Sequence, residues 1–242
     1  MWKHAWLAVA FLTRLPTPDL GKLEAEDFAH SALFYPWVGA LVGALLCLPW
    51  LLFPHAPALL LAAILTALWA GLTGGLHLDG LADSADAWLG GFGDEEKTHR
   101  ILKDPLTGAA GVIAVVSVML LKFAALAALL EGGQGLLILC APIMGRALIL
   151  LLFLTTPYVR AGGLASAVTT HLPRATAWGT ASACLAAGIV VSAWGTAAML
   201  TGFWLLRRLM LQRLQGCTGD TAGATVECGE MFWLVGTALS MP

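Results

Sequence analysis

Charged side chains are scarce in this chain. Asp, Glu, Lys and Arg make up 12% of its 242 residues, whereas an ordinary soluble domain has roughly 25%. No stripe of basic residues could follow a phosphate backbone, which excludes a nucleic-acid-binding protein. Hydrophobic residues make up 59% of the chain. The shortage of charge and the long apolar runs therefore predict an integral membrane protein.

The motifs of several soluble enzyme classes are also missing. The five cysteines form no C-x-x-C pair, and we interpret them as small buried hydrophobic residues. Without a Walker loop, a G-x-G-x-x-G fingerprint or a Ser-His-Asp arrangement, nucleotide-fold chemistry and covalent hydrolysis are disfavoured. Because no internal repeat or soluble domain stands out, we predict one membrane-embedded catalytic domain over residues 1–242.

Apolar runs without charge predict an all-α, polytopic helical bundle of about seven transmembrane helices. The runs lie at 32–53, 58–76, 107–130, 135–157, 175–206 and 221–241. The run at 175–206 is too long for one span of roughly 20 residues. We expect a tight helical hairpin there, near Trp194 and Gly195.

Lys and Arg fall on one side of this arrangement. With seven spans, the connections at 54–57, 131–134 and 193–196 hold neither residue type, and every Lys and Arg outside the spans lies on the opposite side. The positive-inside rule therefore predicts a cytoplasmic N-terminus and cytoplasmic polar loops. We expect the membrane to be the inner membrane.

Three acidic residues stand close together in GGLHLDGLADSAD, residues 74–86. At about 100° per residue, Asp79, Asp83 and Asp86 share one narrow face of a helix. Like charges four residues apart destabilise a helix, so this face favours a bound cation. Mg²⁺ is typically held by one or two carboxylates and by substrate phosphates. We predict a magnesium site, with a solvated acidic face as the alternative.

A second acidic segment, GCTGDTAGATVECGE, occupies residues 216–230. Asp220 and Glu227 are seven residues apart, as Asp79 and Asp86 are, and Glu230 follows. Acids that lead into a membrane span need a partner or a wet cavity. We expect the two acidic helices to meet at the cytoplasmic edge and to hold divalent ions across a diphosphate. Helix capping with solvation is the alternative for this segment.

Basic residues lie between the two acidic segments, in HRILKDPLTGAAG, residues 99–111. Arg100 and Lys103 share a helix face, and Asp104 follows them. Gly108 and Gly111 then open a span, where unpaired amide groups attract anions. These residues form a candidate phosphate cradle, although basic residues beside a span also serve as topology signals.

Arg146, Lys122 and His77 are single polar residues in apolar surroundings. An intramembrane arginine should face the bundle interior and an anion, either a bound phosphate or a structural acid. We interpret Lys122 as a residue that snorkels to the interface. His77 lies about 160° from the Asp face on a continuous helix, so it joins the site only if the start of the helix is unwound.

Six segments resemble the cobalamin synthase family, the adenosylcobinamide-GDP ribazoletransferases. They are FLTRLP (11–16), FYPWVG (34–39), GGLHLDGLADSADAW (74–88), ILKDPLTGAAGV (101–112), APIMGR (141–146) and GCTGDTAGATVECGE (216–230). They occur in the family's order over nearly the whole chain. The pairing of the Asp-rich segment with T-G-D-x-x-G-A-x-x-E is the most specific feature.

The resemblance implies an enzyme of cobalamin nucleotide-loop assembly. In that reaction α-ribazole, or its 5′-phosphate, attacks the diphosphate of adenosylcobinamide-GDP in the presence of Mg²⁺, and GMP leaves. Carried onto this chain, metal ligands would be Asp79, Asp83, Asp86, Asp220 and Glu227. Of these, Asp79, Asp83, Asp220 and Glu227 would be catalytic, with Asp220 or Glu227 as an alternative general base. Substrate would contact Arg100, Lys103, Asp104, Arg146 and His77.

The implied partners are the two substrates and membrane lipid, with no nucleic acid. A homo-oligomer and a complex with other late enzymes of the pathway both stay open.

Two other protein classes use clustered acids in membranes. A CDP-alcohol phosphatidyltransferase needs D-x-x-D-G-x-x-A-R, but Ala87 follows Asp86 where the glycine belongs. A secondary transporter would place acids near the bilayer midplane within inverted repeats, and no such repeat is evident.

Overall fold

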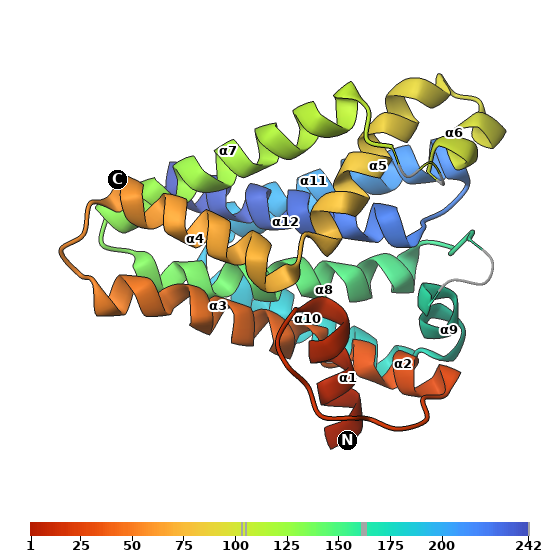
Figure 1. The fold of residues 1–242 in the computed structure, drawn as a ribbon, viewed down its shortest axis with the longest axis horizontal. Helices are drawn as coiled ribbons and strands as arrows, with labels where there is room; N and C mark the ends of the chain where they lie inside the picture. The colour runs from red at the N-terminus through yellow and green to blue at the C-terminus, as the bar shows by residue number, and fades with distance from the viewer. Residues whose placement is uncertain (103, 105, 161–163, 242) are drawn as a thin grey trace.

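The fold is described by a computed structural model, which covers residues 1–102, 104, 106–160 and 164–241 (Figure 1). Within these residues the chain forms twelve α-helices, one short 3-10 helix and no strand, which confirms the all-α prediction. The helices are α1 (Trp2–Leu12), α2 (Ala25–Ala32), α3 (Tyr35–Leu52), α4 (Ala58–Thr73), α5 (Leu76–Gly91), α6 (Glu95–Ile101), α7 (Ala109–Glu131), η1 (Gly135–Leu139), α8 (Cys140–Thr155), α9 (Leu164–His171), α10 (Arg174–Val191), α11 (Ala193–Leu214) and α12 (Gly219–Leu239).

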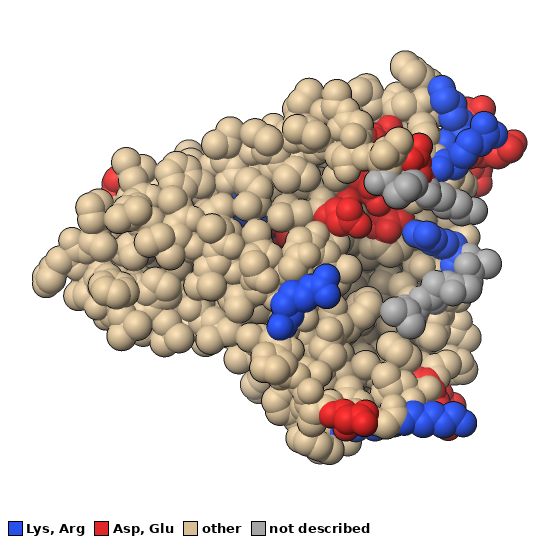
Figure 2. Space-filling model, in the orientation of Figure 1, with Lys and Arg blue, Asp and Glu red and all other residues tan. Residues whose placement is uncertain are grey.

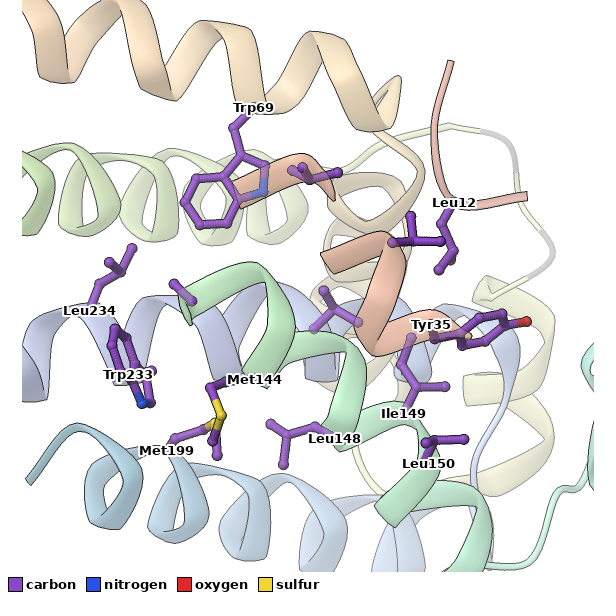
Figure 3. Close-up of a cluster of buried hydrophobic side chains, with 14 of the residues drawn as sticks. Leu12, Tyr35, Trp69, Met144, Leu148, Ile149, Leu150, Met199, Trp233 and Leu234 are labelled. Carbon is purple, nitrogen blue, oxygen red and sulfur yellow. The ribbon is translucent and has the colours of Figure 1, made fainter. Parts of the chain in front are cut away.

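Helices α8 and α12 form the centre of the bundle. Helix α8 packs against α3, α10 and α12, and α12 also packs against α5, α7 and α11. Between them lies a continuous apolar core in which Met144 and Leu148 of α8 face Met199 of α11 and Trp233 of α12 (Figure 3). The second acidic segment is therefore carried by one of the most enclosed helices of the molecule.

The multi-pass character of the chain is confirmed, but the predicted number of seven spans is not. Within the described residues, four segments are long and apolar enough to cross a membrane, namely α3, α7, η1 with α8, and α10. The bent pair of α4 and α5 would be a fifth. Helices α11 and α12 are 22 and 21 residues long, but both carry charged residues. The predicted hairpin occurs at Ser192, between α10 and α11.

Charge is segregated along the long axis of the bundle. The turns at 54–57 and 132–134 lie at one end with the C-terminus, and α2, α6 and α9 lie towards the other (Figure 1). On the face shown in Figure 2, acidic and basic side chains gather at the end that holds α6, and the opposite end is almost free of them. This distribution agrees with the asymmetry of Lys and Arg along the sequence.

A pair of glycines turns the first acidic segment away from the bundle axis. Gly74 and Gly75 have φ angles of +62° and +71°, a left-handed conformation that glycine adopts without steric cost. Helix α5 consequently leaves α4 at an angle of 89°. The aspartates are therefore not on a straight continuation of the second predicted span, because α5 forms a separate helix at the charged end.

The N-terminal helix is fastened to α2 by one carboxylate. Asp27 accepts hydrogen bonds from Lys3 Nζ at 2.8 Å and from His4 Nε2 at 3.1 Å. These contacts, led by the Lys3 hydrogen bond, lower the pKa of Asp27 to about 2. An acid with a depressed pKa stabilises the fold above its ordinary pKa of 3.8, and this contribution disappears as the pH falls towards 2.

We expect Asp27→Asn to loosen α1 at neutral pH, because the amide lacks the charge that Lys3 contacts. Hydrogen exchange in residues 2–12 should increase about two- to fivefold, as expected for a partly exposed ion pair worth up to about 1 kcal/mol. In the wild type the same increase should occur only as the pH falls below about 4. Glu26→Gln, an exposed change on the same helix, is the control. Equal exchange in all three proteins would contradict this role.

Candidate active site

The two acidic helices meet, as the sequence predicted. Gly80 of α5 lies against the backbone of Asp220 in the first turn of α12, so close that a methyl group at Gly80 would be 2.5 Å from the Asp220 carbonyl oxygen. One turn earlier, His77 lies against Gly223. Asp79 and Asp220 both line a cavity of about 180 Å³. Close packing of α5 and α12 at Gly80 and Gly223 thus brings carboxylates from two distant segments to one site.

Asp83 is the carboxylate with the most acidic surroundings. From Gly80 onward, α5 runs past the first residues of α12 and away from the apolar part of the bundle. Burial raises the pKa of Asp83 to about 6, and repulsion by neighbouring carboxylates adds to the shift. These neighbours are Asp79, Asp220 and Asp86. Such a group gains free energy when a cation binds beside it.

Asp86 has a different environment from the other two aspartates of α5. Its carboxylate accepts hydrogen bonds from the backbone N–H groups of Gly108 and Gly111, at 2.7 and 2.9 Å. These are the amides that the sequence assigned to a phosphate. In the structure they hold Asp86, which thereby caps the start of α7.

Arg160 is a site residue that sequence reasoning used only as a topology marker. Its Nη1 donates a hydrogen bond to Asp220 at 2.9 Å. Two backbone hydrogen bonds between Cys217 and the segment of Pro157 and Val159 hold this loop beside the start of α12. The partners are 60 residues apart, so no local pattern in the sequence could have indicated the pair.

Glu227 and Glu230 lie inside the bundle and are neutralised there. Lys122 Nζ of α7 is 2.5 Å from a carboxylate oxygen of each, and Arg146 of α8 donates a hydrogen bond to Glu230. The side chains of Arg146 and Glu230 are 0% exposed. Glu227 is two turns, or about 10 Å, beyond Asp220 along α12. The structure therefore joins Glu227 to Lys122 and not to the aspartates.

Arg146 and Lys122 both contact buried acids. Arg146 has a structural acid, Glu230, as its partner. Lys122 does not snorkel to an interface: it is 3% exposed and lies 4.4 Å from the centre of the Trp69 ring.

Of the charged residues in the predicted cradle, the two that the structure describes contact groups other than the aspartates of α5. Arg100, on α6, pairs with Glu96 at 3.4 Å, and both side chains are largely exposed. Asp104 accepts a hydrogen bond from the backbone N–H of Leu106. Lys103 lies outside the described residues.

His77 and Arg14 lie on opposite walls of the acidic site. His77 lines the cavity together with Asp79. Arg14 lines an open groove of about 510 Å³ on the other side of the first turn of α5, and Asp79 also borders that groove. Sequence reasoning had placed Arg14 only in a family segment and among the topology signals. The turn at Gly74 brings α5 beside Arg14, and a methyl group at Gly74 would meet the Arg14 side chain.

The site as it stands is a set of carboxylates without a completed metal cage. Within the described residues, no group of three or more His, Cys, Asp or Glu side chains is arranged to hold an ion. Asp79, Asp83 and Asp220 lie at the contact of α5 and α12 and face a cavity, a groove or each other. This donor set suits a hard cation that also takes oxygen ligands from a substrate.

These features define a multi-pass helical membrane protein with a carboxylate site at its charged end. In comparison with known proteins, the chain belongs to the cobalamin-5-phosphate synthase family, whose model matches residues 4–238. It is accordingly a transferase of cobalamin biosynthesis. This result favours the resemblance over the phosphatidyltransferase and transporter alternatives.

The relatives match over almost their full length. Adenosylcobinamide-GDP ribazoletransferase of Pseudomonas putida (strain W619) is 52% identical over 239 residues, which cover 97% of this chain and 98% of the relative. The proteins of the same name from Pseudomonas fluorescens (strain Pf0-1) and Ectopseudomonas mendocina (strain ymp) are 51% and 50% identical, with the same coverage. No solved structure matches the chain.

We expect Gly80→Ala to push α5 away from α12, because the added methyl group meets backbone atoms that cannot rotate aside. Overpacking of this kind costs about 1–3 kcal/mol, measurable by thermal unfolding of the purified protein. Gly71→Ala, in the exposed last turn of α4 with nothing within 4 Å of the new methyl group, is the matched control and should be neutral or stabilising. Equal stability of both variants would mean that the helices are not in close contact.

We expect Lys122→Met to be strongly destabilising, because it leaves Glu227 buried without a counter-charge. Breaking a buried ion pair from one side typically costs about 3–5 kcal/mol. In the double variant Lys122→Met/Glu227→Gln the carboxylate is also removed, so part of the stability should return. Thermal unfolding of the two variants tests this, and a double variant no more stable than the single one would refute the pairing.

Proposed function

We propose that the protein transfers the adenosylcobinamide-phosphate group from adenosylcobinamide-GDP to α-ribazole or α-ribazole 5′-phosphate, with release of GMP. The observation that carries this proposal is the match to ribazoletransferases over 97% of the chain. The meeting of α5 and α12 at a carboxylate-lined cavity supports it, because diphosphate chemistry needs such a site.

The residues present fit a bound Mg²⁺. Asp83 is crowded by the like charges of Asp79, Asp220 and Asp86, which Arg160 opposes, and carboxylates of this kind are the usual protein ligands of Mg²⁺. Asp79 and Asp83 would hold the ion. When bound, Mg²⁺ supplies positive charge that orients the diphosphate and stabilises the leaving phosphate.

Asp86 and Glu227 are assigned other roles. The two α7 amides occupy Asp86, and Lys122 neutralises Glu227. We assign Asp86 to holding α7 against α5, and Glu227 to anchoring α12. With these two assignments, Asp86 and Glu227 are removed from the metal ligands that the sequence predicted.

Asp220 is proposed as the general base. It lines the cavity, and Arg160 fixes the orientation of its carboxylate. The hydroxyl oxygen of the acceptor forms a bond to the phosphorus that carries the cobinamide, and the bond from that phosphorus to the bridging oxygen of GMP breaks. Asp220 takes the hydroxyl proton. Arg14, across the groove from Asp79, is proposed to offset the charge of the diphosphate.

The site is proposed to face the cytoplasm from the inner membrane. The charged end of the bundle holds the acidic site, and it carries the Lys and Arg residues that mark the cytoplasmic side of a membrane protein. A water-soluble nucleotide donor would reach the open groove from that side.

The direct test is GMP release by purified protein given adenosylcobinamide-GDP, α-ribazole and Mg²⁺. Asp83→Asn should lower the rate at least about 100-fold, as loss of a main electrostatic contact in a transfer reaction does, while thermal unfolding stays near that of the wild type. Glu26→Gln removes an exposed carboxylate and should retain the full rate. No GMP from folded wild-type protein would refute the proposed function, and full activity of Asp83→Asn would refute the metal assignment.

A further inference from the structure

The cavity beside the acidic site has two chemically different ends. His77, Asp79 and Asp220 form its polar end. The rest of the wall is apolar and partly aromatic, with Phe11 of α1, Tyr35 of α3 and Phe153 of α8. The apolar residues named here are brought together from three helices, and Figure 3 shows Tyr35 near Leu12 and Ile149, which also line the cavity.

The dimensions of the cavity restrict what it can hold. Its volume of about 180 Å³ is below the roughly 300–1,000 Å³ of pockets that take drug-sized ligands. A corrin macrocycle or a whole nucleotide cannot enter, but one or two fused rings can. Tyr35 and Ile149 in its wall are 3% and 4% exposed, so this part of the cavity favours an apolar group.

His77 gives the cavity a specific polar contact. It is 4% exposed, and its Nδ1 atom finds no hydrogen-bond partner within the described part of the chain. A buried nitrogen without a partner is unfavourable, and a ligand with a complementary ring nitrogen would supply the missing hydrogen bond. The cavity therefore offers an apolar slot for a flat ring and one imidazole to recognise a nitrogen in it.

We propose that this cavity binds the flat heteroaromatic base of the acceptor nucleoside, with His77 hydrogen-bonded to a ring nitrogen. This inference rests on the proposed function, because the acceptor in that reaction carries a benzimidazole base on its ribose. With the base in the apolar end, the ribose lies at the polar end, next to Asp220. The large cobinamide donor then occupies the open groove on the other side of Asp79. His77 acts here as a specificity residue.

The inference is tested by binding, independently of turnover. Isothermal titration of the full-length protein in detergent with benzimidazole should give one site. Ala222→Leu places a larger side chain in the cavity wall and should weaken benzimidazole binding about tenfold or more, a loss of about 1.4 kcal/mol or more. Ala186→Leu, the same change at an exposed position of α10, should leave the affinity unchanged.

A second variant keeps the test valid if Ala222→Leu does not fold. His77→Phe preserves a flat ring but removes the nitrogen atoms, so benzimidazole should bind more weakly while indene, which has the same shape and no nitrogen, binds as before. Kinetically, Ala222→Leu should raise the KM for α-ribazole about tenfold and that for adenosylcobinamide-GDP less than about twofold.

The outcomes separate this inference from the proposed function. No benzimidazole binding, or equal binding by the wild type, Ala222→Leu and His77→Phe, overturns the cavity assignment even if GMP is released. An equal rise of both KM values in Ala222→Leu overturns it as well. Benzimidazole binding that Ala222→Leu weakens supports the cavity assignment even if the wild type releases no GMP, in which case the proposed function alone fails.

Discussion

Two glutamates on α12 carry charge into the most enclosed part of the bundle, and the fold depends on their neutralisation. Lys122 comes from α7 and Arg146 from α8, so the ionic cluster fixes α12 between two neighbouring helices. A charge left alone at this depth would be prohibitive. These ion pairs therefore fix the position of α12 along the bundle, and with it the position of Asp220 in the first turn of α12. The acid proposed to act in catalysis is thus on the helix that these two glutamates anchor.

The second determinant is the right-angle turn at Gly74 and Gly75. It ends one apolar helix and lays the first acidic segment across the start of α12, where Gly80 permits backbone contact. Asp79 consequently lies between a largely apolar cavity and an open groove. This division suits a transfer between two substrates of very different size and polarity. It also explains why the site is at the edge of the apolar bundle, where a charged diphosphate can stay hydrated.

Sequence reasoning succeeded where a short-range pattern dictates the structure. The i, i+4, i+7 spacing placed three aspartates on one helix, and the second acidic segment was correctly expected to meet it. It was less accurate for α12, whose acidic residues are compensated by partners distant in the chain. The role of Asp86 was also hidden, because the amides that bind it are 22 and 25 residues away. The same holds for Glu227 and Lys122, which are 105 residues apart.

The sequence by itself determined that this is a helical membrane protein, which segments are acidic, and through their motifs which family it belongs to. Composition and helical periodicity are local properties, so they can be read without coordinates. Only the tertiary structure decided which carboxylates remain available. Asp79 and Asp83 stay at the contact of two helices beside Asp220, which Arg160 holds, while Asp86 caps a helix and Glu227 pairs with a lysine. The physical reason is that a carboxylate's role depends on the nearest donor or cation, and here those partners come from other helices.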